Sequence, residues 1–153
     1  MKKAFSFLIL VFLCGMFSAR LSAELSMPHI FADHMVLQRN EAINLWGSAS
    51  PKEKVTVELN GQKTSVRADA SGKWNATLRP MEAGGPYTLI VKGKKERLAF
   101  DDVLLGEVWI CSGQSNMEFR LHAAMNAEKE IADAENYSFL RSFNVKQEMS
   151  HRP

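Results

Sequence analysis

Residues 25–100 alternate between apolar and polar positions in short runs that are separated by turn residues. Residues 43–46 (INLW) and 55–59 (VTVEL) have the two-residue period of strands with one buried face. The second run meets Asn60-Gly61, a dipeptide that accepts positive φ in a tight hairpin. Several strands at this spacing, without a helical period, predict an antiparallel β-sandwich. The further strands are expected at 64–68, 73–78, 87–91 and 97–100.

The pattern changes near residue 102. Residues 108–111 (VWIC) are apolar without alternation, which is typical of a strand covered on both faces in a parallel sheet. Residues 126–135 are predicted to form a helix that Asn126 can cap, with an apolar stripe on one side. Residues 139–145 are a second candidate strand, which completes one βαβ unit. Such a unit cannot cover both faces of its sheet, so we interpret the chain as a fragment that stops inside a second domain.

The first 23 residues have the composition of a secretory signal peptide. A basic start is followed by an almost wholly apolar stretch over residues 4–17 and by small residues at Ala19 and Ala23. The apolar core is short and polar sequence follows it, so a membrane span is not predicted. Cleavage is expected after Ala23, with Ala19 as the second choice. The protein is then exported, to the periplasm or the medium, with no membrane contact after cleavage.

Removal of this leader changes the charge balance. The full chain has 19 Lys and Arg against 17 Asp and Glu, but the leader holds three of the basic residues and no acid. The remaining part is close to neutral and has no basic stripe interleaved with aromatic residues, so nucleic acid is not an expected partner. Cleavage also removes Cys14 and leaves Cys111 alone, which excludes an internal disulfide.

Ser115 is the candidate nucleophile of the chain. It lies in Gly113-Gln114-Ser115-Asn116, a small and polar turn that follows the apolar run 108–111. A serine hydroxyl is a weak nucleophile until a base takes its proton, and a turn serine that satisfies backbone groups is the alternative interpretation. The turn fits four places of the G-x-S-x-G elbow, but Met117 stands where that elbow needs glycine.

Three separated stretches carry a resemblance to a known family. Residues 106–119 (GEVWICSGQSNMEF) resemble the first sequence block of the SGNH hydrolases, in the form found in the sialate O-acetylesterase family. Residues 28–39 (PHIFADHMVLQR) and 84–89 (GGPYTL) are similar to that family in the same order. The resemblance implies a signal peptide over 1–23, a β-sandwich domain over 24–101, and over 102–153 the first βαβ unit of a three-layer α/β/α SGNH hydrolase domain.

The resemblance also implies an activity: an exported serine esterase that removes O-acetyl groups from sialic acids or related acetylated glycans. Ser115 would attack the acetyl carbonyl and give one oxyanion donor from its own backbone N–H. Gly113, Gln114 and Asn116 are candidates for support of the oxyanion site and its loop, and no cofactor is implied. The amides of Gln114 and Asn116 could instead touch a sugar hydroxyl or serve only a structural role. The family takes its histidine base, its aspartate and its other oxyanion donors from later blocks, so the 153 residues alone are expected to be inactive.

Two further groups of residues have side chains of the types that bind metals or sugars. His29 and His34 flank residues 30–33, which end in Asp33, but they lack helical spacing and further ligands, so no metal site is predicted. Trp46, Trp74 and Tyr87 could form a platform for sugars, although strand positions favour a place in the core. A carbohydrate-binding β-sandwich without catalysis is therefore the alternative function.

Overall fold

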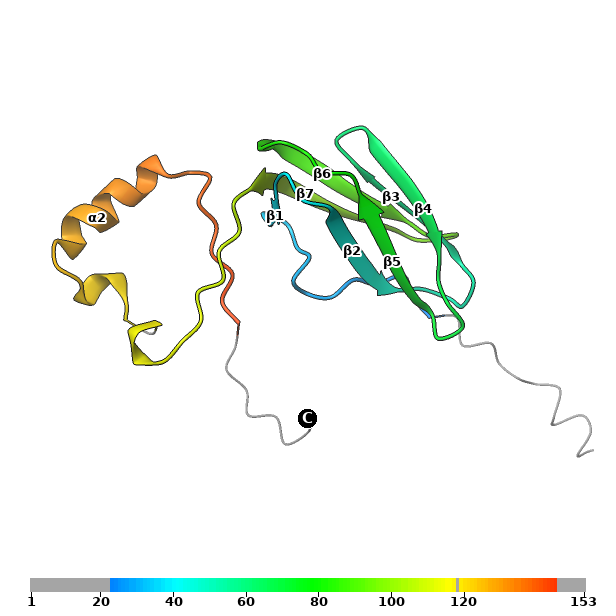
Figure 1. Cartoon of the computed structure of the whole chain (residues 1–153), viewed down its shortest axis with the longest axis horizontal. Coiled ribbons are helices and arrows are strands. Elements are labelled where there is room, and N and C mark those ends of the chain that lie inside the picture. Colours follow the sequence, from blue (N-terminus) through cyan, green and yellow to red (C-terminus); the bar gives the residue numbers. More distant parts are fainter. Residues whose placement is uncertain (1–22, 118, 146–153) are drawn as a thin grey trace, which may run out of the picture.

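A computed structural model describes residues 23–117 and 119–145, which are rich in strands (Figure 1). Within that part of the chain the structure has seven strands and, beyond them, one short α-helix with 3₁₀ turns. The strands are β1 (Val36–Gln38), β2 (Ile43–Ser48), β3 (Lys54–Leu59), β4 (Gln62–Arg67), β5 (Lys73–Leu78), β6 (Gly84–Lys92) and β7 (Arg97–Gly106).

The strands form two sheets that share one core. Five strands are ordered β1-β7-β6-β3-β4, and β2 pairs with β5 in a separate sheet of two. In β5 every second residue is buried, and the same period holds for the first five residues of β2. Inward residues of both sheets belong to a single apolar cluster, which includes Leu45, Trp74, Val57, Leu89 and Val103. The predicted strand-rich character of residues 25–100 is confirmed.

The predicted hairpin at Asn60-Gly61 is confirmed. Leu59 and Gln62 are register partners at the ends of β3 and β4, so only two residues form the loop between them. Both loop residues have positive φ, 43° for Asn60 and 75° for Gly61. This is the backbone that matches the right-handed twist of the flanking strands.

β7 differs from the sequence-based expectation in two ways. Its pairing with β1 is parallel, whereas the pattern predicts antiparallel pairs throughout. The strand also continues from the expected end at Phe100 to Gly106, through the proposed domain boundary between residues 101 and 102. Burial explains the extension, because Val103, Leu104 and Leu105 are all buried and the segment is paired on both edges.

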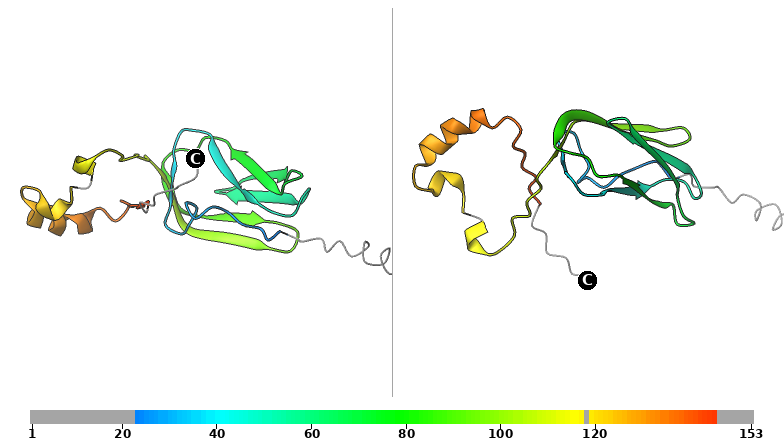
Figure 2. Two further views of the ribbon diagram at one scale, coloured as in Figure 1. Left: turned by 90° about the horizontal axis from the view of Figure 1, so that it is seen from below. Right: turned by 45° about the horizontal axis from the view of Figure 1, so that its top comes forward.

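The helix and the 3₁₀ turns beyond β7 stand apart from the strands in each view, while the segment after them returns towards the end of β7 (Figures 1 and 2). The predicted helix at 126–135 is confirmed as α2 (Ala127–Asp133), continued by a 3₁₀ turn, Ala134–Asn136. Asn126 occupies its N-cap position with φ 63°, yet its side chain makes no capping hydrogen bond. Ile131 of the predicted apolar stripe is half exposed, so that stripe does not face a sheet among the described residues.

The two strands predicted for a βαβ unit are wrong. Residues 108–111 and 139–145 have no strand structure, and Trp109 and Ile110 are 82% and 92% exposed. An apolar run becomes a buried strand only where neighbouring strands pair with its backbone and other layers cover its faces. Among residues 23–117 and 119–145 neither condition holds at these positions.

The proposed signal peptide lies almost wholly outside the described residues, since only Ala23 belongs to them. No helix in the described ranges has the length and apolar character that a membrane crossing needs.

Truncation of the core side chain Leu45 tests the shared core of the two sheets. Leu45 is fully buried, so Leu45→Ala should lower the free energy of unfolding by about 2–5 kcal/mol through lost apolar burial and a residual cavity. Urea unfolding of the two proteins measures this difference. Leu140→Ala is the matched control, because Leu140 is 78% exposed and its loss should change the free energy by less than about 0.5 kcal/mol. Equal effects of the two variants would contradict the assigned core.

Candidate active site

The three stretches that resemble the esterase family meet at the end of β7. β1 lies within residues 28–39 and pairs in parallel with the last residues of β7, as Gln38 opposite Gly106. β6 begins in residues 84–89 and pairs with the other edge, as Gly84 opposite Leu105. β7 itself leads into residues 106–119. Segments far apart in sequence thus fix one point, the exit of β7.

Glu107 anchors the chain where it leaves this sheet. Its carboxylate accepts hydrogen bonds from Arg39 Nε at 2.6 Å and from Gln38 Nε2 at 3.1 Å. The Gln38 side chain also accepts the backbone N–H of Val108 at 2.9 Å. The hydrogen bond from Gln38, followed by that from Arg39, holds the pKa of Glu107 below its usual value. We call Gln38, Arg39 and Glu107 the exit clamp.

Sequence reasoning missed the exit clamp. Gln38 and Glu107 are 69 positions apart, so no local period connects them. A signal was nevertheless present, because both ends of the clamp fall inside stretches that resemble the same family, at Gln38-Arg39 and at Gly106-Glu107.

Ser115 lies on an exposed turn that follows the exit clamp. It begins a 3₁₀ turn, Ser115–Met117, in which the N–H of Met117 donates to the carbonyl of Gln114 at 2.8 Å. A Cβ added at Gly113 would lie 2.8 Å from Cγ of Met117, so a larger residue there would require the exposed Met117 side chain to move. The whole run from residue 111 to 117 is exposed, including Gln114, Ser115 and Asn116. The four predicted site residues, which are consecutive in sequence, thus lie on one exposed turn.

No catalytic partner of Ser115 is found among residues 23–117 and 119–145. Within them, no hydrogen bond joins Ser115 to a histidine or a carboxylate. His34 instead lies with Nδ1 2.7 Å from Oδ2 of Asp102, and Nη2 of Arg141 donates to the same oxygen at 2.9 Å. These contacts, first that of His34 and then that of Arg141, lower the pKa of Asp102. His34 thus makes a structural contact that fastens the segment before β1 to β7, and Arg141 fastens the returning segment to the same carboxylate.

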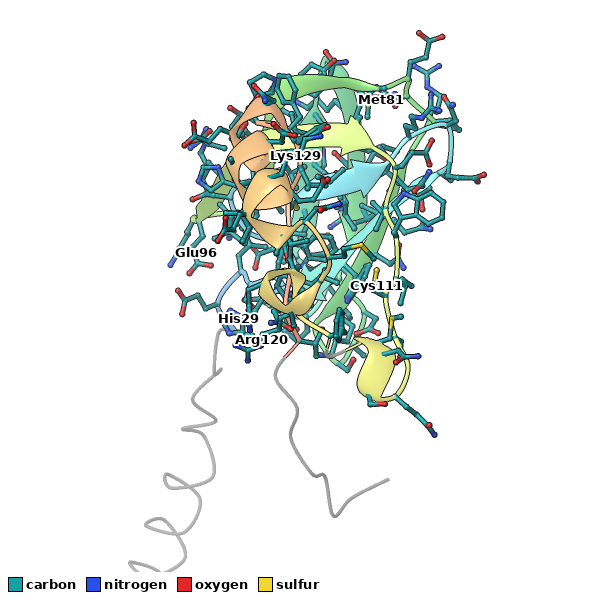
Figure 3. All side chains as sticks on the ribbon, turned by 90° about the vertical axis from the view of Figure 1, so that its left-hand side faces the viewer. His29, Met81, Glu96, Cys111, Arg120 and Lys129 are labelled. Atoms are coloured by element: carbon teal, nitrogen blue, oxygen red, sulfur yellow. The ribbon has the colours of Figure 1, made fainter. Side chains whose placement is uncertain are left out.

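The remaining candidate residues take mostly structural positions. Trp74 is 3% exposed, which confirms its predicted place in the core, and Tyr87 packs against the same core. Trp46 is 42% exposed and meets the ring of Phe31 edge to face at 4.7 Å. Cys111 is exposed on the segment after the exit clamp (Figure 3). No group of three metal-binding side chains occurs in the described part of the chain.

Neutralisation of Glu107 tests the exit clamp. Glu107→Gln should speed hydrogen exchange of the Val108 amide a few-fold at neutral pH, on the scale of an exposed ion pair, because the clamp loses its charge. A glutamate side chain in an unfolded chain has a pKa of about 4.3, and the pKa of Glu107 in the folded protein is lower. The stabilisation is therefore present above the unfolded value and is lost as the pH falls through the folded-state pKa.

Exchange rates by NMR across the pH range measure this effect. The difference between the two proteins should be full at neutral pH and vanish in acid. Glu128→Gln, on an exposed residue of α2, removes the same charge and should leave the Val108 amide unchanged. A Val108 amide that exchanges alike in all three proteins would show that the clamp does not hold the chain.

Comparisons with known proteins agree with the resemblance. No family model matches the chain. The chain is 35% identical over 142 residues to a sialate O-acetylesterase of Mus musculus, an alignment that covers 83% of this chain and 26% of the relative. It is 37% identical over 122 residues to a sialate O-acetylesterase of Homo sapiens, which covers 72% of this chain and 23% of the relative.

Among solved structures, a carbohydrate acetylesterase from Xanthomonas citri superimposes with a TM-score of 0.69 and 39% sequence identity. That match covers 71% of this chain and 25% of the solved one. The chain therefore spans about a quarter of the length of the relatives that it matches. Over the stretch that it shares with them, the chain belongs to the sialate O-acetylesterase family.

Proposed function

We propose that this chain is the part of an exported carbohydrate esterase that carries the nucleophile, Ser115, and that the enzyme removes O-acetyl groups from sialic acids or related acetylated glycans. The observation that carries the proposal is the exposed turn of residues 113–116, on the segment whose first residues the exit clamp fixes. The relatives are named sialate O-acetylesterase and carbohydrate acetylesterase, and their identity with this chain supports the same chemistry here.

The proposed reaction has two steps. Oγ of Ser115 attacks the acetyl carbonyl while a base takes its proton, and the sugar oxygen leaves with that proton as a hydroxyl. Water then attacks the acetyl-enzyme, releases acetate and returns the proton to Ser115. Each step passes through a tetrahedral oxyanion, to which the backbone N–H of Ser115 would donate one hydrogen bond. The reaction needs no cofactor.

The base and the other oxyanion donors are proposed to come from a longer protein. The relatives are about four times as long as the stretch that they share with this chain, which supports this division. A histidine paired with an aspartate would take the proton of Ser115, and a glycine and an asparagine would complete the oxyanion site. The chain described here would be inactive without them.

The domain arrangement is part of the same proposal. Residues 24–101 would form a β-sandwich domain, and residues 102–153 would begin a three-layer α/β/α SGNH hydrolase domain. The exposed apolar side chains of the second part support this division, because Trp109, Ile110 and Leu140 are of the type that a larger domain buries.

Substitution of the proposed nucleophile is the direct test. In the full-length enzyme, Ser115→Ala should lower acetate release from O-acetylated sialic acid by about a thousandfold or more, because the acyl-enzyme can no longer form. Acetate release and serine-directed phosphonate labelling, located by mass spectrometry, measure the two consequences. Ser112→Ala removes a hydroxyl three positions earlier on the same exposed segment and should retain activity. Full activity of Ser115→Ala would end the assignment, and a protein that binds glycans without releasing acetate would favour the carbohydrate-binding alternative.

Export is tested by the N-terminus of the mature protein. The proposed cleavage after Ala23 predicts that protein recovered from the periplasm or the medium begins at Glu24, with cleavage after Ala19 as the second position. Intact-mass measurement and N-terminal sequencing give the answer. Deletion of residues 2–19 should keep the protein in the cytoplasm. Protein that keeps Met1 and remains in the cytoplasm would contradict export while leaving the esterase proposal untouched.

A further inference from the structure

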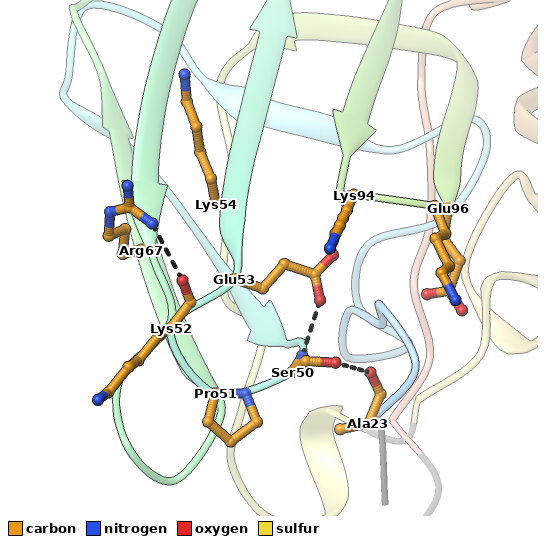
Figure 4. Close-up of a pocket in the computed structure, with 10 residues that line it drawn as sticks. Ala23, Ser50, Pro51, Lys52, Glu53, Lys54, Arg67, Lys94 and Glu96 are labelled. Carbon is orange, nitrogen blue, oxygen red and sulfur yellow. Dashed lines mark hydrogen bonds between the residues drawn. The ribbon is translucent and has the colours of Figure 1, made fainter. Parts of the chain in front are cut away.

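A cavity of about 580 Å³ lies at the end of the strands where β3 begins and β4 ends (Figure 4). Residues 50–54, Arg67 and residues 94–96 supply most of its wall. Lys94 to Glu96 precede β7, whereas the exit clamp follows that strand, so the length of β7 separates the cavity from the exit clamp. The wall has an excess of three positive charges, from two carboxylates and five basic residues: Lys52, Lys54, Arg67, Lys94 and Lys95.

Both carboxylates of the cavity are occupied by backbone groups. Glu53 accepts hydrogen bonds from the N–H of Lys94 at 2.6 Å and from the N–H of Ser50 at 3.1 Å. The hydrogen bond from Lys94 is the main cause that lowers the pKa of Glu53. Glu96 accepts the N–H of Leu25. Within the described ranges, none of the five basic side chains lies in a salt bridge. Within that part of the chain no ion pair neutralises these charges, and only that of Lys94 contributes to the lowered pKa of Glu53, as a minor cause.

Two of these basic residues directly oppose each other. Lys54 and Arg67 are register partners in the β3–β4 hairpin, and both are exposed. Like charges in this position destabilise a sheet. Near the turn of the same hairpin, opposite charges face each other instead: Glu58 is the register partner of Lys63, and Nζ of Lys63 lies 2.6 Å from Oε1 of Glu58. The unbalanced pair therefore costs stability at the position where it borders the cavity.

We propose that this cavity binds a carboxylate group of an anionic saccharide chain, a proposal that rests on the proposed action on sialic acids. Nη1 of Arg67 donates to the carbonyl of Lys52 at 3.3 Å, which holds the guanidinium at the cavity (Figure 4). Its remaining N–H groups can donate to a carboxylate, and the lysines of the wall raise the positive potential there. Sialic acids carry such a carboxylate. Single-stranded nucleic acid is disfavoured, because none of the residues that line the cavity is aromatic and bases would have no ring to stack on.

Binding of a short oligomer of sialic acid to the protein tests the proposal. Calorimetry at low ionic strength should show binding that weakens as salt is raised towards about 0.3 M, since exposed charges are screened. Lys54→Gln with Arg67→Gln should weaken binding about fivefold or more. The same oligomer with its carboxylates converted to methyl esters should not bind. Absence of binding up to about 1 mM oligomer, or equal binding of the ester, would overturn the proposal.

Lys63→Gln is the matched control variant, because it removes one positive charge from the same hairpin outside the cavity. It should leave the affinity unchanged. Urea unfolding should also give opposite results for the two single variants. Lys54→Gln removes the repulsion with Arg67 and should raise the urea midpoint. Lys63→Gln removes the ion pair with Glu58 and should lower it. A Lys63→Gln variant that loses affinity as the double variant does would reduce the effect to overall charge and contradict a specific cavity.

Two further measurements distinguish this proposal from binding of other anionic ligands and from the proposed esterase activity. Single-stranded DNA or anionic lipid vesicles that bind as tightly as the sialic acid oligomer would overturn the saccharide assignment. In the full-length enzyme, the double variant should release acetate from a small neutral acetylated sugar at the normal rate. The binding assay needs no turnover, so failure of the cavity and failure of Ser115 as nucleophile give different results.

Discussion

The structure depends on the pairing of β7 along both of its edges. Parallel β1 and antiparallel β6 both reach the last residues of this strand, and its Val103 and Leu105 side chains are buried in the core that is shared with the second sheet. A backbone paired on two sides and buried has little freedom, so the residue that follows it starts from a defined position. Glu107 is that residue, and its bonds to Arg39 and Gln38 carry the constraint one step beyond the sheet. The segment that carries Ser115 is thus fixed to the strands at its first residue, Glu107, and continues as an exposed loop.

Charge is distributed unequally along this framework. At the exit of β7 the carboxylate of Glu107 is matched by Arg39, and the Glu58 carboxylate is matched by Lys63 and Lys92 in the neighbouring strands. At the opposite end, the carboxylates of Glu53 and Glu96 bind backbone N–H groups instead of the lysines beside them. The near-neutral balance of the chain therefore conceals a local excess of positive charge. Composition alone could not reveal it, because the same residues count equally whether they are paired or not.

Much of the strand framework could be predicted from the sequence, whereas its pairing could not. The two-residue period of 55–59 and the Asn60-Gly61 turn are local signals, and the structure contains both as predicted. The parallel pair of β1 and β7 joins segments almost seventy residues apart, and no period encodes such a partner. The prediction of a strand at 108–111 is wrong because a run of four apolar residues shows only that the segment is apolar. A strand also requires a neighbouring strand whose backbone pairs with it. For the candidate site, the sequence predicts the turn at 113–116. It does not predict the exit clamp at the start of that segment, because the clamp depends on the pairing of β1 with β7.

The loop that carries Ser115 is fastened to β7 at two places. Glu107 binds it immediately after the strand, and Arg141 binds it again through Asp102, within β7 itself. The entropy cost of closing a loop grows only slowly with the number of its residues, so the charge-assisted contact of Arg141 with Asp102 offsets part of that cost. Both contacts use carboxylates with lowered pKa values, so each is present at neutral pH and is lost when acid protonates its carboxylate. Because the two carboxylates lie five positions apart, one strand determines where the loop leaves the sheets and where it returns. β7 and the charges near its end therefore determine where the loop with the candidate nucleophile begins and where it returns, while the reactivity of the Ser115 hydroxyl requires groups that this strand does not supply.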